Sequence, residues 1–398
     1  MTPAVHFLSW AMLRTTALVL IATLAWCSPE KTGEAKPSQP AVTETPRPGL
    51  PELARFLAGK MEPGESRLGK LAALPGYKQH KTQVSGIWSM YVKDFSVPLQ
   101  EWREQNVPAV KSKTVFYPFA GPDFPNANTI YPNGETYIMI GLEPAGFAPD
   151  FESMSDHKAM SELRRMLQSV DYVSRRSYFI TSFMNQSYII TEGVAPVILM
   201  YLGLLDFVPY SVKAIDLDPN GKIRYLSDEE VKQYRQQRKW THVEVRFQAA
   251  AGQPLKTIYY FKQDVQDEAL EKDPRLLKYL ESLPQYASVF KAASYLIHYE
   301  TFSRIGDVVV NKSELIVMDD TGPRMKKLQG QFDVTVFGHY GRPIPPFQSQ
   351  YQSDLAKMYR DQKPQPIKFR YGYGGSDGSR GILLVTRKQQ QTQATPEK

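Results

Sequence analysis

The stretch VFYPFAGPDFPNAN, residues 115–128, joins an apolar run to a turn that carries polar side chains. Gly121 precedes a proline and is therefore biased toward extended backbone. Asp123, Asn126 and Asn128 can each form a turn or cap a helix. Because open α/β sheets bind ligands where their strands end, these four residues are candidate ligand-binding residues, and a purely structural turn is the alternative.

Three further strand ends carry groups capable of chemistry. Glu143 follows the apolar run TYIMIGL, where nucleoside-binding Rossmann-like proteins place the acid that binds ribose. Asp319 and Asp320 end the run SELIVMDD, and neighbours on an extended chain point to opposite sides, so at most one of them faces a given cleft. His339 lies in the loop-like GHYGRPIPPF. All four are candidate ligand or catalytic residues, although structural roles would explain each of them.

The motifs of several enzyme classes are absent. The sequence contains no H-E-x-x-H and no P-loop. It also contains no G-x-G-x-x-G, and Gly121 stands alone in its turn. The only cysteine is Cys27, which excludes an intrachain disulfide and a thiolate site in the body. We therefore expect no metal and no cofactor.

The composition is that of an ordinary globular protein. Of 398 residues, 42% are hydrophobic and 22% are charged, which suits a large folded core. The net charge of +7 is spread along the chain without a basic block. We therefore expect a mildly basic surface and no nucleic-acid partner.

The N-terminus has the features of an export signal. A short positive start precedes the apolar run TTALVLIATLAW, which is too short to span a bilayer comfortably. Residues 1–27 are thus a predicted signal peptide, and the Pro- and Thr-rich residues 28–52 a disordered tether. LAWC resembles a bacterial lipobox at Leu24, Ala25 and Cys27, with Trp26 as a departure. That resemblance implies lipidation at Cys27 and a membrane anchor, with plain secretion or an uncleaved anchor as alternatives.

The rest of the chain divides into a helical extension (53–110), an α/β core (111–388) and a polar tail (389–398). The amphipathic spacing from Trp88 to Trp102 predicts a helix that Pro98 kinks or splits. Further helices are expected at 156–174, 178–190, 194–205, 274–307 and 353–360. Strands are expected at 114–120, 136–142, 212–217, 242–249, 256–262, 313–320 and 332–340, with a closing β-hairpin at 367–388. This alternation predicts a three-layer α/β core with a mixed, mostly parallel, Rossmann-like sheet.

The stretches VFYPFAGPDFPNAN, TYIMIGLEP, KAASYLIHYETFSRI, ELIVMDDTG and FRYGYG resemble an uncharacterised family of exported bacterial proteins. That resemblance implies no activity and no catalytic residues. A fainter likeness is to Rossmann-like methyltransferases, whose glycine motif is missing here. The sequence thus predicts an exported, lipid-anchored envelope protein that binds an unknown small molecule or envelope partner. A degenerate methyltransferase-like enzyme using Asp123 and Glu143, and an envelope hydrolase using Asp319 or Asp320 with His339 or Asp123, are the alternatives.

Overall fold

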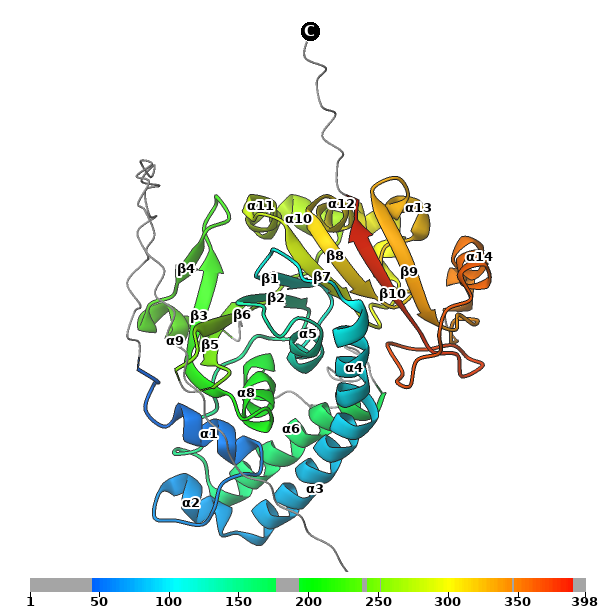
Figure 1. Ribbon diagram of the computed structural model, residues 1–398. Helices are drawn as coiled ribbons and strands as arrows, with labels where there is room; N and C mark the ends of the chain where they lie inside the picture. The colour runs from blue at the N-terminus through cyan, green and yellow to red at the C-terminus, as the bar shows by residue number, and fades with distance from the viewer. Residues whose placement is uncertain (1–44, 177–192, 238–241, 251, 346, 389–398) are drawn as a thin grey trace, which may run out of the picture. The chain divides into compact units, whose positions relative to one another are not determined.

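The computed structural model describes residues 45–176, 193–237, 242–250, 252–345 and 347–388 (Figure 1). The predicted signal peptide, most of the tether, Cys27, the helix expected at 178–190 and the polar tail lie outside the described residues. The described chain is an α/β structure built on one mixed sheet.

The sheet contains ten strands in the order β4-β3-β5-β6-β2-β1-β7-β8-β10-β9. Their bounds are β1 Thr114–Tyr117, β2 Thr136–Gly141, β3 Val208–Leu217, β4 Ile223–Tyr225, β5 His242–Gln248, β6 Leu255–Lys262, β7 Tyr286–Phe290, β8 Ser313–Met318, β9 Phe332–Gly338 and β10 Gly381–Arg387. The five central strands β6, β2, β1, β7 and β8 are parallel, so their carboxyl ends share one edge.

The prediction of a mostly parallel sheet is wrong. Antiparallel pairing joins β4, β3, β5 and β6 on one side and β8, β10 and β9 on the other. Adjacent β-rich segments joined by short turns favour antiparallel pairing, since parallel strands need long crossovers. The predicted C-terminal hairpin is also wrong. Only β10 forms there, and it pairs with β8 and β9 because the preceding Gly-rich residues form turns.

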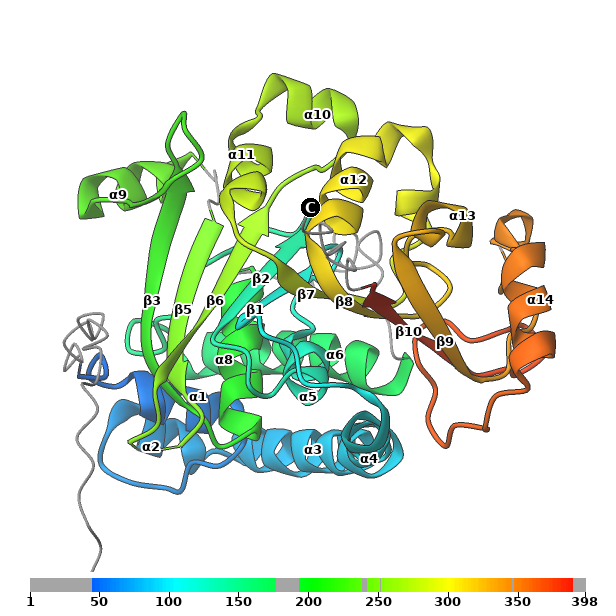
Figure 2. The same cartoon turned by 45° about the horizontal axis from the view of Figure 1, so that its top comes forward.

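Helices cover both faces of the sheet (Figure 2). Those on one face are α1 Leu50–Leu57, α2 Arg67–Ala72, α3 Pro75–Tyr91, α4 Val97–Asn106, α5 Phe124–Ile130, α6 Asp156–Arg176 and α8 Val194–Leu204. Those on the other are α10 Asp267–Lys272, α11 Arg275–Ser282, α12 Ser303–Lys312 and α13 Met325–Leu328. Near the sheet edges lie α9 Asp228–Gln236 and α14 Ser353–Gln362, and short 3₁₀ turns occupy Leu296–His298, Glu300–Phe302 and Gln348–Gln350.

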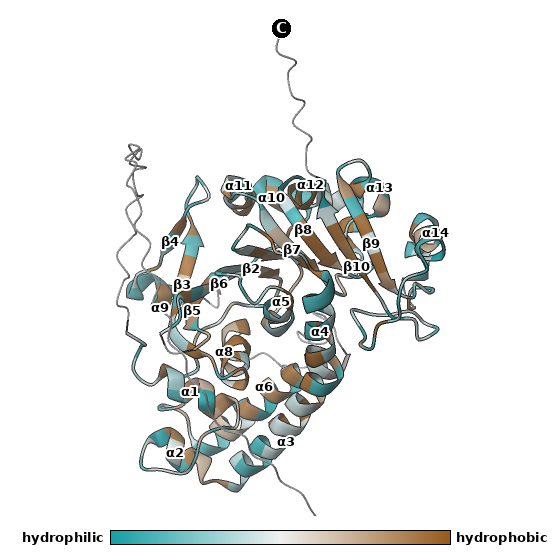
Figure 3. Cartoon of the chain, viewed as in Figure 1, coloured by the Kyte–Doolittle hydropathy of each residue, from teal (hydrophilic) through white to brown (hydrophobic). Residues whose placement is uncertain are grey.

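Two hydrophobic cores follow from the alternation of side chains along the central strands. On β1, Val115 and Tyr117 belong to the core beneath α1–α8, whereas Phe116 belongs to the core beneath α10–α12. Every residue of α8 is buried, and its surface is hydrophobic on all sides (Figure 3). None of the helices described here is long and apolar enough to cross a bilayer.

Two local predictions need correction. The helix expected at 274–307 is interrupted by β7, a fully buried strand. The prediction was wrong because a short, mostly apolar run does not distinguish strand from helix. The helix around Trp88 is divided as expected, but by a π-helix, Val92–Ser96, that ends just before Pro98. Single π-turns within helices are frequent near functional sites.

Candidate functional site at the carboxyl edge of the parallel strands

A cleft of about 170 Å³ opens at the carboxyl ends of β1, β2, β6 and β7. In the sheet, β2 and then β6 lie on one side of β1, and β7 lies on the other side. The cleft therefore lies where strand order reverses, the usual ligand position in open α/β sheets. Its lining residues are Phe119, Gly121, Ile140, Gly141, Leu142, Glu143, Gln263, Asp264, Val265, Gln266, Ala292, Ala293, Ser294, Leu296 and Phe302.

Glu143 is the buried acid of the cleft wall. Its side chain is 2% exposed, and its Oε2 accepts a hydrogen bond from the Tyr260 hydroxyl at 3.2 Å. Its Oε1 is buried and has no hydrogen-bond partner in the described chain. Gly141 permits this arrangement, since a Cβ there would lie 2.5 Å from both Glu143 Oε2 and the Tyr260 hydroxyl. A buried carboxylate oxygen without a partner costs free energy, and a donor from a bound ligand would remove that cost.

The loop after β7 is the most strained segment of the cleft. Ala292, Ser294 and Tyr295 have φ of 52°, 52° and 54°, a left-handed conformation that costs non-glycine residues free energy. Phe119, on the opposite loop, has φ of 60°. Such outliers persist where surrounding contacts impose them, and they gather at binding sites.

Four hydrogen bonds hold this loop against the turn after β8 and the C-terminal Gly-rich segment. The Ala292 N–H donates to Asp319 Oδ2 at 2.8 Å, and the Ala293 N–H donates to Thr321 Oγ1 at 2.9 Å. The Tyr295 hydroxyl donates to Asp320 Oδ2 at 2.7 Å. Ser294 Oγ lies 3.0 Å from the Tyr373 hydroxyl. The cleft wall is therefore rigid and positioned before any ligand arrives.

Asp123 does not point into the cleft but forms a buried ion pair. Its Oδ2 lies 2.6 Å from Lys291 Nζ, with side chains 5% and 1% exposed. The Tyr117 hydroxyl also donates to this oxygen, at 3.1 Å. Lys291 Nζ lies 5.0 Å from the centre of the Phe95 ring, in the π-helix. Burial raises the pKa of Asp123, and the charge of Lys291 opposes that rise.

Several polar atoms around this ion pair lack partners. Asn126 donates to the hydroxyls of Tyr117 and Tyr371 at 3.4 and 3.3 Å. Its own Oδ1, together with Asp123 Oδ1 and the hydroxyls of Tyr91 and Tyr201, has no hydrogen-bond partner in the described chain. Burial, and then the charge of Asp123, raises the pKa of the Tyr91, Tyr117 and Tyr201 hydroxyls. This region is a polar core beside the cleft.

Asp319 and Asp320 lie behind the strained loop. Asp319 is 2% exposed and accepts hydrogen bonds from the backbone of Ala292 and Thr321 and from the Thr321 hydroxyl. Burial raises the pKa of Asp319 to about 6. Burial, and then the charge of Asp319, raises the pKa of Asp320 to about 7. Both carboxylates contact the loop after β7, Asp319 at Ala292 and Asp320 at Tyr295. The expectation that their side chains point to opposite sides stays a prediction.

The remaining candidates lie apart from the cleft. His339 is exposed, and it lines with Asp320 a hollow of about 20 Å³, room for about one water molecule. Asn128 accepts a hydrogen bond from the Tyr137 hydroxyl at 3.3 Å. Of the sequence candidates, the structure places only Gly121 and Glu143 on the cleft wall.

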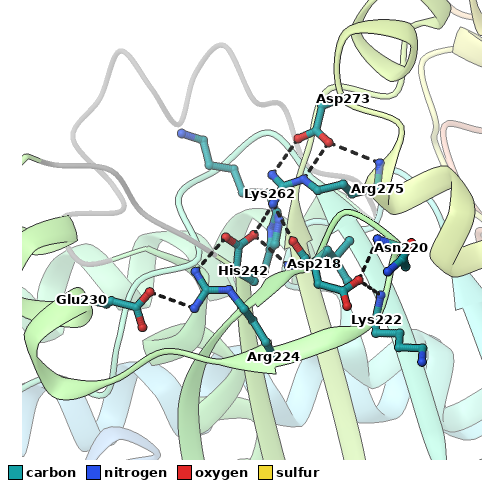
Figure 4. A network of polar contacts seen from close by, with 11 residues as sticks. Asp218, Asn220, Lys222, Arg224, Glu230, His242, Lys262, Asp273 and Arg275 are labelled. Atoms are coloured by element: carbon teal, nitrogen blue, oxygen red, sulfur yellow. Dashed lines mark hydrogen bonds and ion pairs between the residues drawn. The ribbon is translucent and has the colours of Figure 1, made fainter.

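A second polar network lies where β3, β5 and α11 meet (Figure 4). Arg275 contacts Asp273 and Asp216 at 2.8 and 3.0 Å, and Arg224 contacts Asp216 and Glu230 at 3.5 and 2.8 Å. Each of these two arginines and three acids has a partner of opposite sign, so the ion pairs join β3, β4, α9 and α11.

A larger hollow, about 690 Å³, lies among α1, β3, α9 and residues 147–152. It is far larger than the cleft but touches no carboxyl end of the parallel strands. Its lining mixes acids with bases, including Asp150, Asp228 and Arg235, and contains no buried polar atom without a partner among the described residues. The chemistry therefore favours the smaller cleft.

Sequence reasoning missed Lys291, Tyr260, Asp264 and the strained loop. Lys291 directly follows the segment YASVF. Its position at the end of a strand was missed because that segment was interpreted as part of a helix. No grouping of three or more His, Cys, Asp or Glu suited to a metal ion occurs in the described ranges.

Comparisons of the chain with protein-family models, with curated proteins and with solved structures give no match.

Proposed function

We propose that this protein is an exported, lipid-anchored protein of the bacterial cell envelope that binds a small molecule in the carboxyl-edge cleft. The observation that carries the binding proposal is Glu143, a buried carboxylate at the switch point of the strand order, one of whose oxygens has no hydrogen-bond partner among the described residues. The rigid loop opposite it supports the same conclusion, since preorganised walls bind with less loss of entropy.

The proposal of export and lipidation depends on the sequence of residues 1–52. Its test is mass spectrometry of the mature N-terminus from native membranes, with Cys27→Ala as the control. A diacyl or triacyl mass on Cys27 supports the anchor. An intact N-terminus on a cytosolic protein contradicts it and leaves the binding proposal standing alone.

The test of binding is methyl NMR of the purified body, with Ile140, Leu142 and Leu296 as reporters on the cleft wall. A library of small amines, alcohols and acids is added in turn. Saturable shifts at these methyls support the proposal. Shifts at none of them, with every library member at millimolar concentration, contradict it.

A degenerate Rossmann-like, methyltransferase-like enzyme is the second candidate. The observation that favours it is the order of seven neighbouring strands in the sheet, β6-β2-β1-β7-β8-β10-β9. If β3, β4 and β5 are left out, these strands are the third, second, first, fourth, fifth, seventh and sixth along the chain, so β10 is inserted before the last. This is the strand order of the Rossmann fold apart from the insertion. We infer that the sheet derives from that fold.

The residues of the cleft do not fit S-adenosylmethionine. The loop after β1 has one glycine in place of a glycine motif, and its Asp123 is committed to Lys291. A cleft of about 170 Å³ encloses a group the size of benzene, not a nucleoside with an amino acid. Titration with S-adenosylmethionine should therefore show no saturable binding, and tight binding lost in Glu143→Gln would favour the enzyme.

The hydrolase alternative has the least support. The Asp319 carboxylate is occupied by backbone donors, and Asp123 by Lys291. Only Asp320 and His339 share a hollow, and it has room for about one water molecule.

A further inference from the structure

The charge of the cleft wall indicates which class of ligand it accepts. Within the described chain, the lining contains two carboxylates, Glu143 and Asp264, and no Lys, Arg or His. A wall of this charge repels phosphates and carboxylates and attracts cations. Lys291, although it follows β7 directly, is turned away and neutralised by Asp123.

The Glu143 oxygen that lacks a hydrogen-bond partner among the described residues further restricts the class of ligand that the cleft can bind. In the part of the chain that the structure describes, Oε1 is a buried acceptor without a partner, so a ligand that satisfies it must bring a hydrogen-bond donor in addition to the positive charge that the wall attracts. A quaternary ammonium or a sulfonium has no such donor. A primary or secondary ammonium has both, and a charge-assisted hydrogen bond to a carboxylate is about twice as strong as a neutral one.

Most of the remaining lining is apolar, and Gln263, Gln266 and Ser294 are its polar side chains. Phe119 and Phe302 stand edge to face with ring centres 6.0 Å apart, and Ile140, Val265 and Leu296 add aliphatic surface. Aromatic faces attract cations, and the aliphatic side chains bury an apolar body. The volume of about 170 Å³ suits a body near the size of benzene.

We propose that the cleft binds a small primary or secondary organic amine, with its ammonium on Glu143 and its apolar body between Phe119, Phe302 and Leu296. This inference rests on the proposed binding function and specifies its ligand class. Asp264, which is exposed and accepts a hydrogen bond from the Gln266 N–H at 2.9 Å, adds long-range attraction at the entrance.

The test uses three probes that share a ring and differ in the head group: benzylamine, benzyl alcohol and benzoate. Calorimetry and methyl NMR on the purified chain measure affinity and locate the site. Benzylamine should shift the Ile140, Leu142 and Leu296 methyls and bind at least about tenfold more tightly than benzyl alcohol. Benzoate should not bind, because the wall repels its charge.

Variants assign the effect to the carboxylate. Glu143→Gln should weaken benzylamine binding about tenfold or more and leave benzyl alcohol within about twofold. Asp264→Asn should weaken benzylamine only about two- to threefold, an effect that salt removes. Glu135→Gln is the matched control, since Glu135 is exposed at the opposite end of β2, and it should change nothing.

The outcomes separate this inference from the proposed function. Equal affinity for benzylamine and benzyl alcohol, with shifts at the cleft methyls, overturns the amine class and preserves the binding site. Tighter binding of benzylamine that Glu143→Gln does not weaken also overturns it. Absence of saturable binding for all three probes overturns the amine class and counts against the binding site itself.

Discussion

The two polar regions of this molecule differ in how completely their charges are paired. Around Arg275, the carboxylates of Asp216, Asp218, Asp273 and Glu230 each lie within ion-pair or hydrogen-bond distance of a cation or a backbone donor (Figure 4). At the carboxyl edge, Glu143 and Asp123 each keep one buried oxygen without a partner in the described residues. A region of complete pairing stabilises the fold, whereas incomplete pairing at the carboxyl edge indicates a place kept for a ligand.

The pH responses of the two regions also differ in sign. In the Arg275 region, burial lowers the pKa of His242 to about 4, so the unfolded chain takes up the proton first and stability falls as pH drops from about 6.5 to 4. At the carboxyl edge, burial raises the pKa of Asp320 to about 7. The folded chain then holds the proton longer, and stability falls as pH rises from about 4 to 7.

The largest expected effect comes from breaking the buried ion pair. Lys291→Met leaves the Asp123 charge buried without its counterion, and we expect a loss of about 3–5 kcal/mol of unfolding free energy. Urea unfolding measures it. In Asp123→Asn/Lys291→Met both charges are gone, so most of the loss should return. A loss below about 1 kcal/mol in Lys291→Met would show that the pair is not buried as described.

Asp320→Asn tests how the carboxyl edge contributes to the pH dependence of stability. The variant removes a carboxyl whose ionisation is unfavourable in the fold, while the amide oxygen still accepts the Tyr295 hydrogen bond. We expect it to be more stable than the wild type by about 1–3 kcal/mol at pH 8 and equal to it near pH 4. Unfolding curves from pH 4 to 8 test this. A constant difference across that range would contradict the raised pKa.

Arg275→Met tests the paired region. The variant removes ion pairs to Asp273 and Asp216 and a hydrogen bond to the Leu217 carbonyl. The Arg275 side chain is 33% exposed, so solvent screening limits the expected loss to about 1–2 kcal/mol. The loss should shrink in 1 M salt. An effect that salt leaves unchanged would point to lost packing of the arginine stem instead.

The smallest expected changes in stability come from removing single tyrosine hydroxyls. Tyr201→Phe removes a buried hydroxyl without a partner, so stability should stay equal or rise by up to about 1 kcal/mol. Tyr117→Phe removes a hydroxyl that donates to Asp123 and should cost about 1–2 kcal/mol. Thermal and urea unfolding compare the pair. A larger loss for Tyr201→Phe would reveal a partner, such as an internal water, that satisfies it.

Much of the fold could be predicted from sequence, and the reasons are local. β2 was predictable because TYIMIGL is a continuous apolar run. The short helix α5 was not among the expected helices, and Asp123 makes no side-chain cap for it. The α/β class is confirmed. β7 was not predictable, because YASVF precedes a long stretch with helical spacing and a short run of four apolar residues and a serine fits either structure.

The candidate site was predictable only in part. The position of Glu143 after β2 places it at the carboxyl edge of any parallel sheet. Its missing partner, the pairing of Asp123 with Lys291 and the left-handed loop at Ala292 depend on residues far apart in the chain. Sequence spacing does not indicate such contacts. Lys291 was missed because the strand before it, β7, was assigned to a helix.

The most direct test of the central claim measures stability and binding together in Glu143→Gln and Arg275→Met. Urea unfolding gives stability, and titration with benzylamine gives affinity. Glu143→Gln should lose about tenfold or more in affinity with little change in stability, because Oε1 makes no hydrogen bond to any described residue. Arg275→Met should lose stability and keep its affinity. If Glu143→Gln instead loses stability as Arg275→Met does and binds benzylamine unchanged, the carboxyl-edge cleft is structural and the claim is wrong.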